Sequence, residues 1–233
     1  MPDNKIKLEL YLVRHGESMS QAGLNDTLPA ELAADTPLSP KGLREAELLG
    51  EYLSSFPIDH IVSSSLRRSL NTAYEVIKRQ PENGAKYAEV HKLFVECGTG
   101  EGTPGRTIDE IRKEFPPMIA AEGMDEGEKL IYYGADDTDE QLLGRAKTCI
   151  NYLLDRFHNG EKVMVTAHAA FNTFLMYAAL GIPADNEFDP TFHNTSITKI
   201  IFYNEGQGAC RDIHLVYHNA VPHLIGEFEE FRI

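Results

Sequence analysis

Two arginines and two histidines in this sequence follow apolar runs, at points where strands of a sheet would end. Arg14 and His15 follow the first run, Arg68 lies at a helix start after a second run, and His168 directly follows a third. In open α/β sheets, ligands bind in the crevice outside the carboxyl ends of the strands. Guanidinium groups and N–H groups at helix N-termini commonly bind phosphate. If these strand ends share one edge, they form a pocket for a phosphate-bearing anion.

Each of these residues also has a purely structural explanation. A lone histidine at a strand end is more often a hydrogen-bonded structural group than a catalyst. Arg68 alone would be a surface residue paired with an acid, and the serines at 63–65 would cap a helix. Only the combination of three such strand ends favours an anion site.

The elements that would hold these residues alternate between strands and helices. Alternating apolar residues at positions 6–12 predict the first strand, and Ser39 followed by Pro40 predicts a helix start. This order predicts a three-layer α/β fold, with a mostly parallel sheet, helices on both faces and an antiparallel edge strand from a final hairpin around 204–209. Further strands are expected near 58–62, 87–95, 162–167, 197–203 and 212–217, and helices near 40–53, 66–77, 107–115, 138–157 and 169–180.

No internal repeat or linker divides the chain, so residues 1–233 are expected to form a single domain. Two irregular segments stand out, a polar loop at about 18–38 and a glycine-rich stretch at about 96–139. Irregular segments of this length are usually functional. We expect the second to be a lid insertion, and substrate specificity to lie in both.

Composition excludes several classes of partner. The net charge is −14 and no basic cluster is present, so neither nucleic acid nor an anionic membrane is an expected partner. The longest apolar stretch, 163–180, is interrupted by polar residues and does not predict a membrane span. Cys97, Cys149 and Cys210 show no pairing or metal-binding spacing, as is typical of reduced thiols in a cytoplasmic protein. The expected partner is a small phosphorylated substrate.

A second set of residues is a rival metal site, formed by His214, His218, His223 and Glu227. On a strand, His214 and His218 would lie on one face but over ~13 Å apart, too far to share one ion. We therefore expect neither a metal nor a cofactor.

The stretch Leu12-Val13-Arg14-His15-Gly16-Glu17-Ser18 resembles the signature of the histidine phosphatase superfamily, which includes the cofactor-dependent phosphoglycerate mutases. The resemblance implies a metal-independent phosphoric monoester hydrolase acting on a small phosphorylated metabolite. A phosphomutase and a non-catalytic phosphate-binding protein are the alternatives. The chain has no tryptophan and so lacks the mutases' tryptophan-containing motif, which weighs against mutase activity. Later motifs of the family are matched in order by residues 38–42, 63–73, 93–102, 163–168 and 194–200.

His15 is the expected nucleophile. A neutral imidazole, with an unperturbed pKa of about 6.5, has a free lone pair near neutrality, and a phosphohistidine divides one hard displacement into two. Its other ring nitrogen should donate to a backbone carbonyl. Arg14, Arg68 and a protonated His168 would bind the phosphate oxygens. The resemblance implies Glu96 as the acid that protonates the leaving group, with Glu101 as its local rival.

Three further residues complete the expected site. Gln21 and Ala169 are expected to bind phosphate or substrate, at positions where the family usually has asparagine and glycine. The Gln21 amide can still donate a hydrogen bond, and Ala169 keeps its backbone N–H but adds a methyl group. Glu17, beside the nucleophile, is expected to support it structurally.

Overall fold

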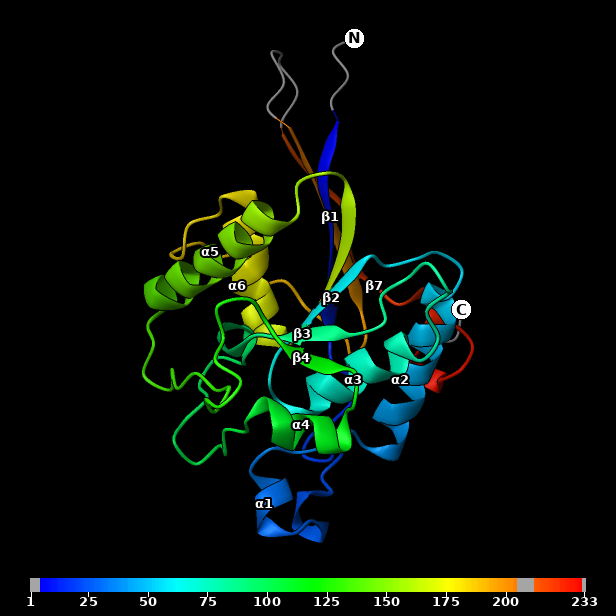
Figure 1. The fold of residues 1–233 in the computed structure, drawn as a ribbon, viewed down its shortest axis with the longest axis vertical. Coiled ribbons are helices and arrows are strands. Elements are labelled where there is room, and N and C mark those ends of the chain that lie inside the picture. Colours follow the sequence, from blue (N-terminus) through cyan, green and yellow to red (C-terminus); the bar gives the residue numbers. More distant parts are fainter. Residues whose placement is uncertain (1–4, 205–211, 232–233) are drawn as a thin grey trace.

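The computed structural model describes residues 5–204 and 212–231, which form a seven-stranded sheet with helices on both faces (Figure 1). The strands are β1 (Ile6–Arg14), β2 (His60–Ser63), β3 (Ala88–Val90), β4 (Met118–Ala120), β5 (Glu161–Ala167), β6 (Ile197–Tyr203) and β7 (Ile213–Ala220). The helices are α1 (Ala30–Ala33), α2 (Pro40–Leu53), α3 (Arg67–Ile77), α4 (Ile108–Glu114), α5 (Asp139–Arg156) and α6 (Ala169–Leu180).

The strand order across the sheet is β4-β3-β2-β5-β1-β6-β7. The five strands from β4 to β1 are parallel, whereas β6 runs antiparallel to both β1 and β7. The predicted mostly parallel sheet with an antiparallel edge is therefore confirmed. The strand β4 was not predicted, because three residues directly after Pro116-Pro117 are too few to show a periodic pattern.

The alternation along β1 builds two hydrophobic cores, one on each face of the sheet. Leu8, Leu10 and Leu12 pack with apolar residues of α5 and α6. Tyr11 and Val13 face the other side and pack with α2, α3 and α4. Successive strand residues point to opposite faces, so this single strand, buried on both sides, requires the three-layer arrangement (Figure 1).

Local capping interactions determine where several helices begin. Ser39 Oγ accepts a hydrogen bond from the backbone N–H of Gly42 at 3.0 Å, and Pro40 is the first residue of α2, as predicted. Thr107 and Thr138 each form a capping box at the start of α4 and α5. These side chains satisfy N–H groups that the first helical turn leaves unpaired.

The segment expected to be a lid contains regular structure as well as loops. Within residues 96–139, α4 buries Ile108 and Ile111 completely, and β4 pairs with β3. Residues 97–107 and 121–137 contain no helix or strand.

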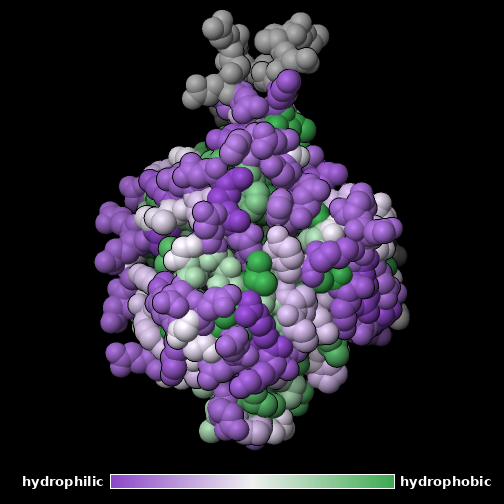
Figure 2. All heavy atoms as spheres, viewed as in Figure 1, coloured by the Kyte–Doolittle hydropathy of each residue, from purple (hydrophilic) through white to green (hydrophobic). Residues whose placement is uncertain are grey.

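The surface of the molecule is largely polar on the face that Figure 2 shows, with small, scattered apolar areas. None of the helices that the structure describes combines the length and apolar composition needed to span a bilayer. Cys97 and Cys149 are free thiols, whereas Cys210 and residues 205–209 of the predicted turn lie outside the described residues.

Candidate active site

The carboxyl ends of β1, β2 and β5 lie side by side at one edge of the sheet. Arg14 at the end of β1 pairs with Ala167 at the end of β5, and β2 ends level with them. The backbone N–H of His15 then donates to the carbonyl oxygen of Ala167 at 3.0 Å. As a result, the His15 and His168 rings lie 5.1 Å apart, measured between centroids. The three strand ends singled out in the sequence therefore meet.

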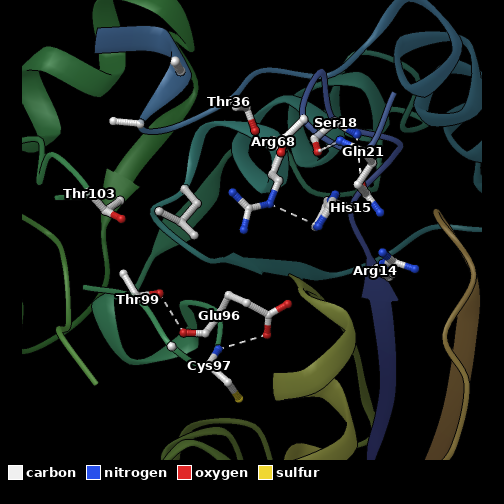
Figure 3. A pocket seen from close by; sticks show the side chains of 15 residues that line it. Arg14, His15, Ser18, Gln21, Thr36, Arg68, Glu96, Cys97, Thr99 and Thr103 are labelled. Atoms are coloured by element: carbon white, nitrogen blue, oxygen red, sulfur yellow. Dashed lines mark hydrogen bonds between the residues drawn. The ribbon is translucent and has the colours of Figure 1, made fainter. Parts of the chain in front are cut away.

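A hydrogen bond at one ring nitrogen of His15 fixes the ring so that the other nitrogen faces Arg68. Nδ1 lies 2.6 Å from the carbonyl oxygen of Gly16 and must donate to it, because a carbonyl only accepts. Nε2 consequently carries the lone pair and accepts a hydrogen bond from Arg68 Nε at 3.1 Å (Figure 3). Burial, together with the positive charges of Arg68 and Arg14, lowers the pKa of His15 well below its ordinary 6.5. The ring is therefore a neutral imidazole at neutral pH.

Two glycines let the turn that carries His15 pack on the start of α2. A Cβ atom on Gly16 would lie 2.4 Å from the carbonyl oxygen of Gly42, and one on Gly42 would lie 1.9 Å from that of Glu17. No side chain fits such approaches between backbones. Glu17 also accepts a hydrogen bond from Ser39 Oγ at 2.7 Å, which supports the structural role expected for it.

Arg14 and Arg68 line the site, whereas their neighbour Arg67 does not. Arg14 is held by a 2.6 Å hydrogen bond from Nη1 to a backbone carbonyl, and Arg68 lies in the first turn of α3. Burial lowers the pKa of both guanidinium groups, but arginine stays charged in proteins. Arg67 instead pairs with Glu114 of α4. The site therefore has two cations.

His168 lies fully buried at the N-cap of α6, beside His15. Its Nε2 lies 2.8 Å from Ser64 Oγ and 3.4 Å from Ser69 Oγ. Burial, followed by the charge of Arg68, lowers the pKa of His168 well below its ordinary 6.5. The protonated form expected from the sequence is therefore disfavoured unless an anion lies against the ring, because a nearby negative charge favours the imidazolium.

A cavity of about 400 Å³ opens at this edge of the sheet. Five residues predicted from the sequence line it and come from β1, α3 and two loops: Arg14, His15, Gln21, Arg68 and Glu96 (Figure 3).

Glu96 lies across the cavity from Arg68 and His15 (Figure 3). Its Oε1 accepts hydrogen bonds from the backbone N–H groups of Cys97 and Phe171, each at 3.0 Å. Burial raises the pKa of Glu96 above its ordinary 4.5, against the opposing effect of these hydrogen bonds and of the arginines. A carboxyl group that stays protonated to higher pH is suited to donate a proton.

The remaining candidates differ in their position. Gln21 lines the cavity, and its Oε1 accepts from Ser18 N at 3.0 Å and from Asn194 Nδ2 at 3.3 Å. Its NH₂ group makes no hydrogen bond to any other described residue, so it is the part available to a ligand. Glu101 is exposed and does not line the cavity. Ala169 is the first residue of α6 and is not among the lining residues either.

The hydroxyl side chains of the cavity were not predicted from the sequence. They lie in the two irregular segments expected to hold specificity, and one of them, Ser18, is also the last residue of the signature stretch. No periodicity marks individual positions in such loops. These residues are Ser18, Ser20, Thr36, Thr99 and Thr103.

Two of the three histidines of the rival metal site, His218 and His223, have separate hydrogen-bond partners. His218 Nδ1 lies 3.0 Å from Thr198 Oγ1, and His223 Nε2 lies 2.9 Å from Thr195 Oγ1. Within residues 5–204 and 212–231, no three His, Cys, Asp or Glu side chains are grouped so as to hold a metal ion.

Most of the chain matches the sequence model of a known protein family. The model of the histidine phosphatase superfamily (branch 1) matches residues 10–213. A named relative, the probable phosphoglycerate mutase GpmB of Serratia proteamaculans, is 24% identical over 203 residues, covering 83% of this chain and 84% of the relative.

Solved structures share the fold at low sequence identity. The phosphoserine phosphatase of Entamoeba histolytica, in complex with 3-phosphoglyceric acid, superposes with a TM-score of 0.56 at 20% identity, covering 86% of this chain and 98% of that one. A mycobacterial glucosyl-3-phosphoglycerate phosphatase gives a TM-score of 0.58 at 23% identity, covering 83% and 90%.

Proposed function

Because this chain belongs to the histidine phosphatase superfamily, we propose that it is a phosphoric monoester hydrolase that acts on a small phosphorylated metabolite without a metal ion. The observation that carries the proposal is the 3.1 Å contact between Arg68 Nε and His15 Nε2, which holds a neutral imidazole at a cavity with two guanidinium groups. Glu96 adds a carboxyl group with a raised pKa to the same cavity. Nucleophile, charge stabilisation and proton donor are thus together.

In the first step, Nε2 of His15 attacks phosphorus and the bond between phosphorus and the alcohol oxygen breaks. Phosphoryl transfer depends chiefly on positioning and on stabilisation of the equatorial oxygens. Arg14 and Arg68 supply both, and His168 takes up a proton as the phosphate dianion approaches. Glu96 gives its proton to the leaving alkoxide.

In the second step, the Glu96 carboxylate removes a proton from water as the water oxygen attacks the phosphohistidine. Inorganic phosphate leaves, His168 releases to solvent the proton that it took up, His15 regains its neutral ring and Glu96 keeps the proton taken from water. We also propose that the chain works as a single domain whose segment 96–139 supplies a lid. Cys97, Gly98, Thr99 and Thr103, which line the cavity, support this role.

A phosphomutase would share the first step and pass the phosphoryl group to a second substrate instead of water. The name of the Serratia relative, probable phosphoglycerate mutase, favours this second candidate. The two differ in whether inorganic phosphate is released.

The direct test is phosphate release from p-nitrophenyl phosphate in the presence of a chelator. Turnover should be insensitive to the chelator and should fall on the order of 1000-fold or more in His15→Ala. His158→Ala, at an exposed histidine outside the cavity, is the matched control and should keep full activity. A requirement for added metal, retained activity in His15→Ala, or no phosphate release by the wild type would contradict the proposal.

A further inference from the structure

The titratable side chains of the cavity other than Cys97 all belong to the proposed phosphoryl transfer. Among the lining residues that the structure describes, these are Arg14, His15, Arg68 and Glu96. Burial raises the pKa of Cys97, which also lines the cavity, to about 12, so its thiol is neutral. No lysine and no third arginine is found among these described lining residues. A second anionic group on the substrate would therefore have no cation of its own.

Two further arginines near the cavity wall are already paired. Arg106 Nη2 lies 3.2 Å from Asp35 Oδ2, and both Arg106 and Arg67 pair with Glu114. Asp35 is only 2% exposed and stands between the lining residues Ala34 and Thr36. Removing one partner of a buried ion pair is strongly destabilising. Arg106 consequently anchors the wall through the buried Asp35, and neither arginine is free to pair with the ligand.

The rest of the polar lining is uncharged and rich in hydroxyl groups. The side chains of Ser20, Thr36 and Thr103 make no hydrogen bond to any other residue that the structure describes, and all three line the cavity. A hydroxyl group both donates and accepts, so it complements another hydroxyl group. In Figure 3, Thr103 lies at the end of the cavity away from Arg14, where the alcohol part of a phosphomonoester would extend.

We propose that the substrate is the monophosphate of a small uncharged, hydroxyl-bearing alcohol of the polyol or sugar class, and that the cavity discriminates against phosphorylated hydroxy acids. The inference rests on the proposed hydrolase function. A carboxylate on the alcohol part would find no free cation among the described residues that line the cavity. An unpaired charge in a partly desolvated site weakens binding.

The test compares glycerol 3-phosphate with 3-phosphoglycerate. The first has a CH₂OH group at the end where the second has a carboxylate, and the two are otherwise the same. Both are measured as competing inhibitors of p-nitrophenyl phosphate hydrolysis and as substrates by phosphate release. Glycerol 3-phosphate should inhibit more strongly and react with a kcat/KM higher by on the order of 10- to 100-fold. Equal inhibition, stronger inhibition by 3-phosphoglycerate, or inhibition by neither would overturn the proposal.

Variants locate the source of the discrimination. Thr103→Val should lower the kcat/KM for glycerol 3-phosphate relative to that for p-nitrophenyl phosphate by about 2- to 10-fold, as expected for one lost hydrogen bond. Thr103→Arg should reduce the preference over 3-phosphoglycerate about tenfold by supplying the missing cation. Thr148→Val, outside the cavity on α5, is the control and should leave both ratios unchanged. An unchanged preference in Thr103→Arg would contradict the inference.

Failure of this inference is distinguishable from failure of the proposed function. If p-nitrophenyl phosphate is hydrolysed through His15 but 3-phosphoglycerate is preferred, only the substrate class is wrong. If p-nitrophenyl phosphate is not hydrolysed, the hydrolase function itself is wrong.

Discussion

Arg68 donates a hydrogen bond from Nε to Nε2 of His15 at 3.1 Å, so one guanidinium group contacts the nitrogen proposed to attack phosphorus. Because a neighbouring cation disfavours the imidazolium form, Arg68 also contributes to the lowered pKa of His15. The same side chain thus adds to the effect of burial, which is the main cause of the lowered pKa of His15, and places positive charge where the phosphate would bind.

Replacing Arg68 should lower the catalytic rate and also change the pKa of His15. Arg68→Gln should lower kcat/KM for p-nitrophenyl phosphate by on the order of 100-fold, the usual cost of removing one preorganised donor to transition-state charge. The pKa of His15, followed by NMR titration, should rise at the same time. Arg67→Gln is the matched control, because the adjacent Arg67 pairs with Glu114 and does not line the cavity. Comparable losses in both variants would contradict the role assigned to Arg68.

Variants of Glu96 and Glu101, the two candidates for the acid, should differ in how strongly their activity depends on the leaving group of the substrate. Glu96→Gln should lower kcat/KM for an alkyl phosphate on the order of 100-fold and for p-nitrophenyl phosphate much less, since kcat/KM reports the first step and nitrophenolate leaves without a proton. The raised pKa of Glu96 also predicts that alkyl phosphate hydrolysis declines as the pH rises through that pKa. This decline should vanish in Glu96→Gln. Glu101→Gln should behave as the wild type, and a larger effect there than at Glu96 would reverse the assignment.

The contact between Gly42 and the signature segment should be essential for stability. A Cβ atom at Gly42 would lie 1.9 Å from the carbonyl oxygen of Glu17, so Gly42→Ala should destabilise the protein by about 1–3 kcal/mol or more. Gly144→Ala in α5 is the control, because no atom lies within 4 Å of its added Cβ, and it should stabilise the helix by up to about 1 kcal/mol. Urea unfolding measures both, and a harmless Gly42→Ala would disprove the packing argument.

Two buried histidines should make stability depend on pH. Burial lowers the pKa of His91 and of His223 to about 4 each, whereas the unfolded chain titrates near its ordinary value of about 6.5. Below that value the unfolded state binds more protons, so the free energy of unfolding should fall as the pH drops from about 6.5 toward 4, by at most about 1.4 kcal/mol per pH unit for each group.

The measurement is urea unfolding of the wild type and His223→Gln at neutral and mildly acidic pH. The variant should be less stable at neutral pH, because it loses the contact with Thr195, but should lose less stability on acidification. His158→Gln, at an exposed position, should retain the wild-type difference. An equal loss on acidification in His223→Gln and the wild type would exclude His223 as a source of the pH dependence.

Local patterns in the sequence determined most of the elements and the position of the site. The alternating apolar residues at positions 6–12 predicted a strand, and β1 has a hydrophobic core on each face. Ser39-Pro40 predicted the start of α2. Arg14, His15 and His168 were predicted as neighbours because parallel strands bring their carboxyl ends to one edge. The strand β4 was not predicted. It is a strand because it pairs with β3, and its three residues show no local pattern of their own.

The tertiary structure alone decided which ring nitrogen of His15 faces Arg68, that Glu96 and not Glu101 lines the cavity, and that several hydroxyl side chains line it as well. These features depend on the paths of two irregular loops. Those paths are set by contacts between distant residues, such as Asp35 with Arg106 and Glu96 with the backbone of Phe171. The periodic pattern of a strand or helix is visible within a few neighbouring residues. The path of a loop, by contrast, depends on contacts with residues that are distant in the sequence. For that reason the sequence by itself predicted most of the side chains proposed to act at this site, and only the folded chain decided what surrounds them.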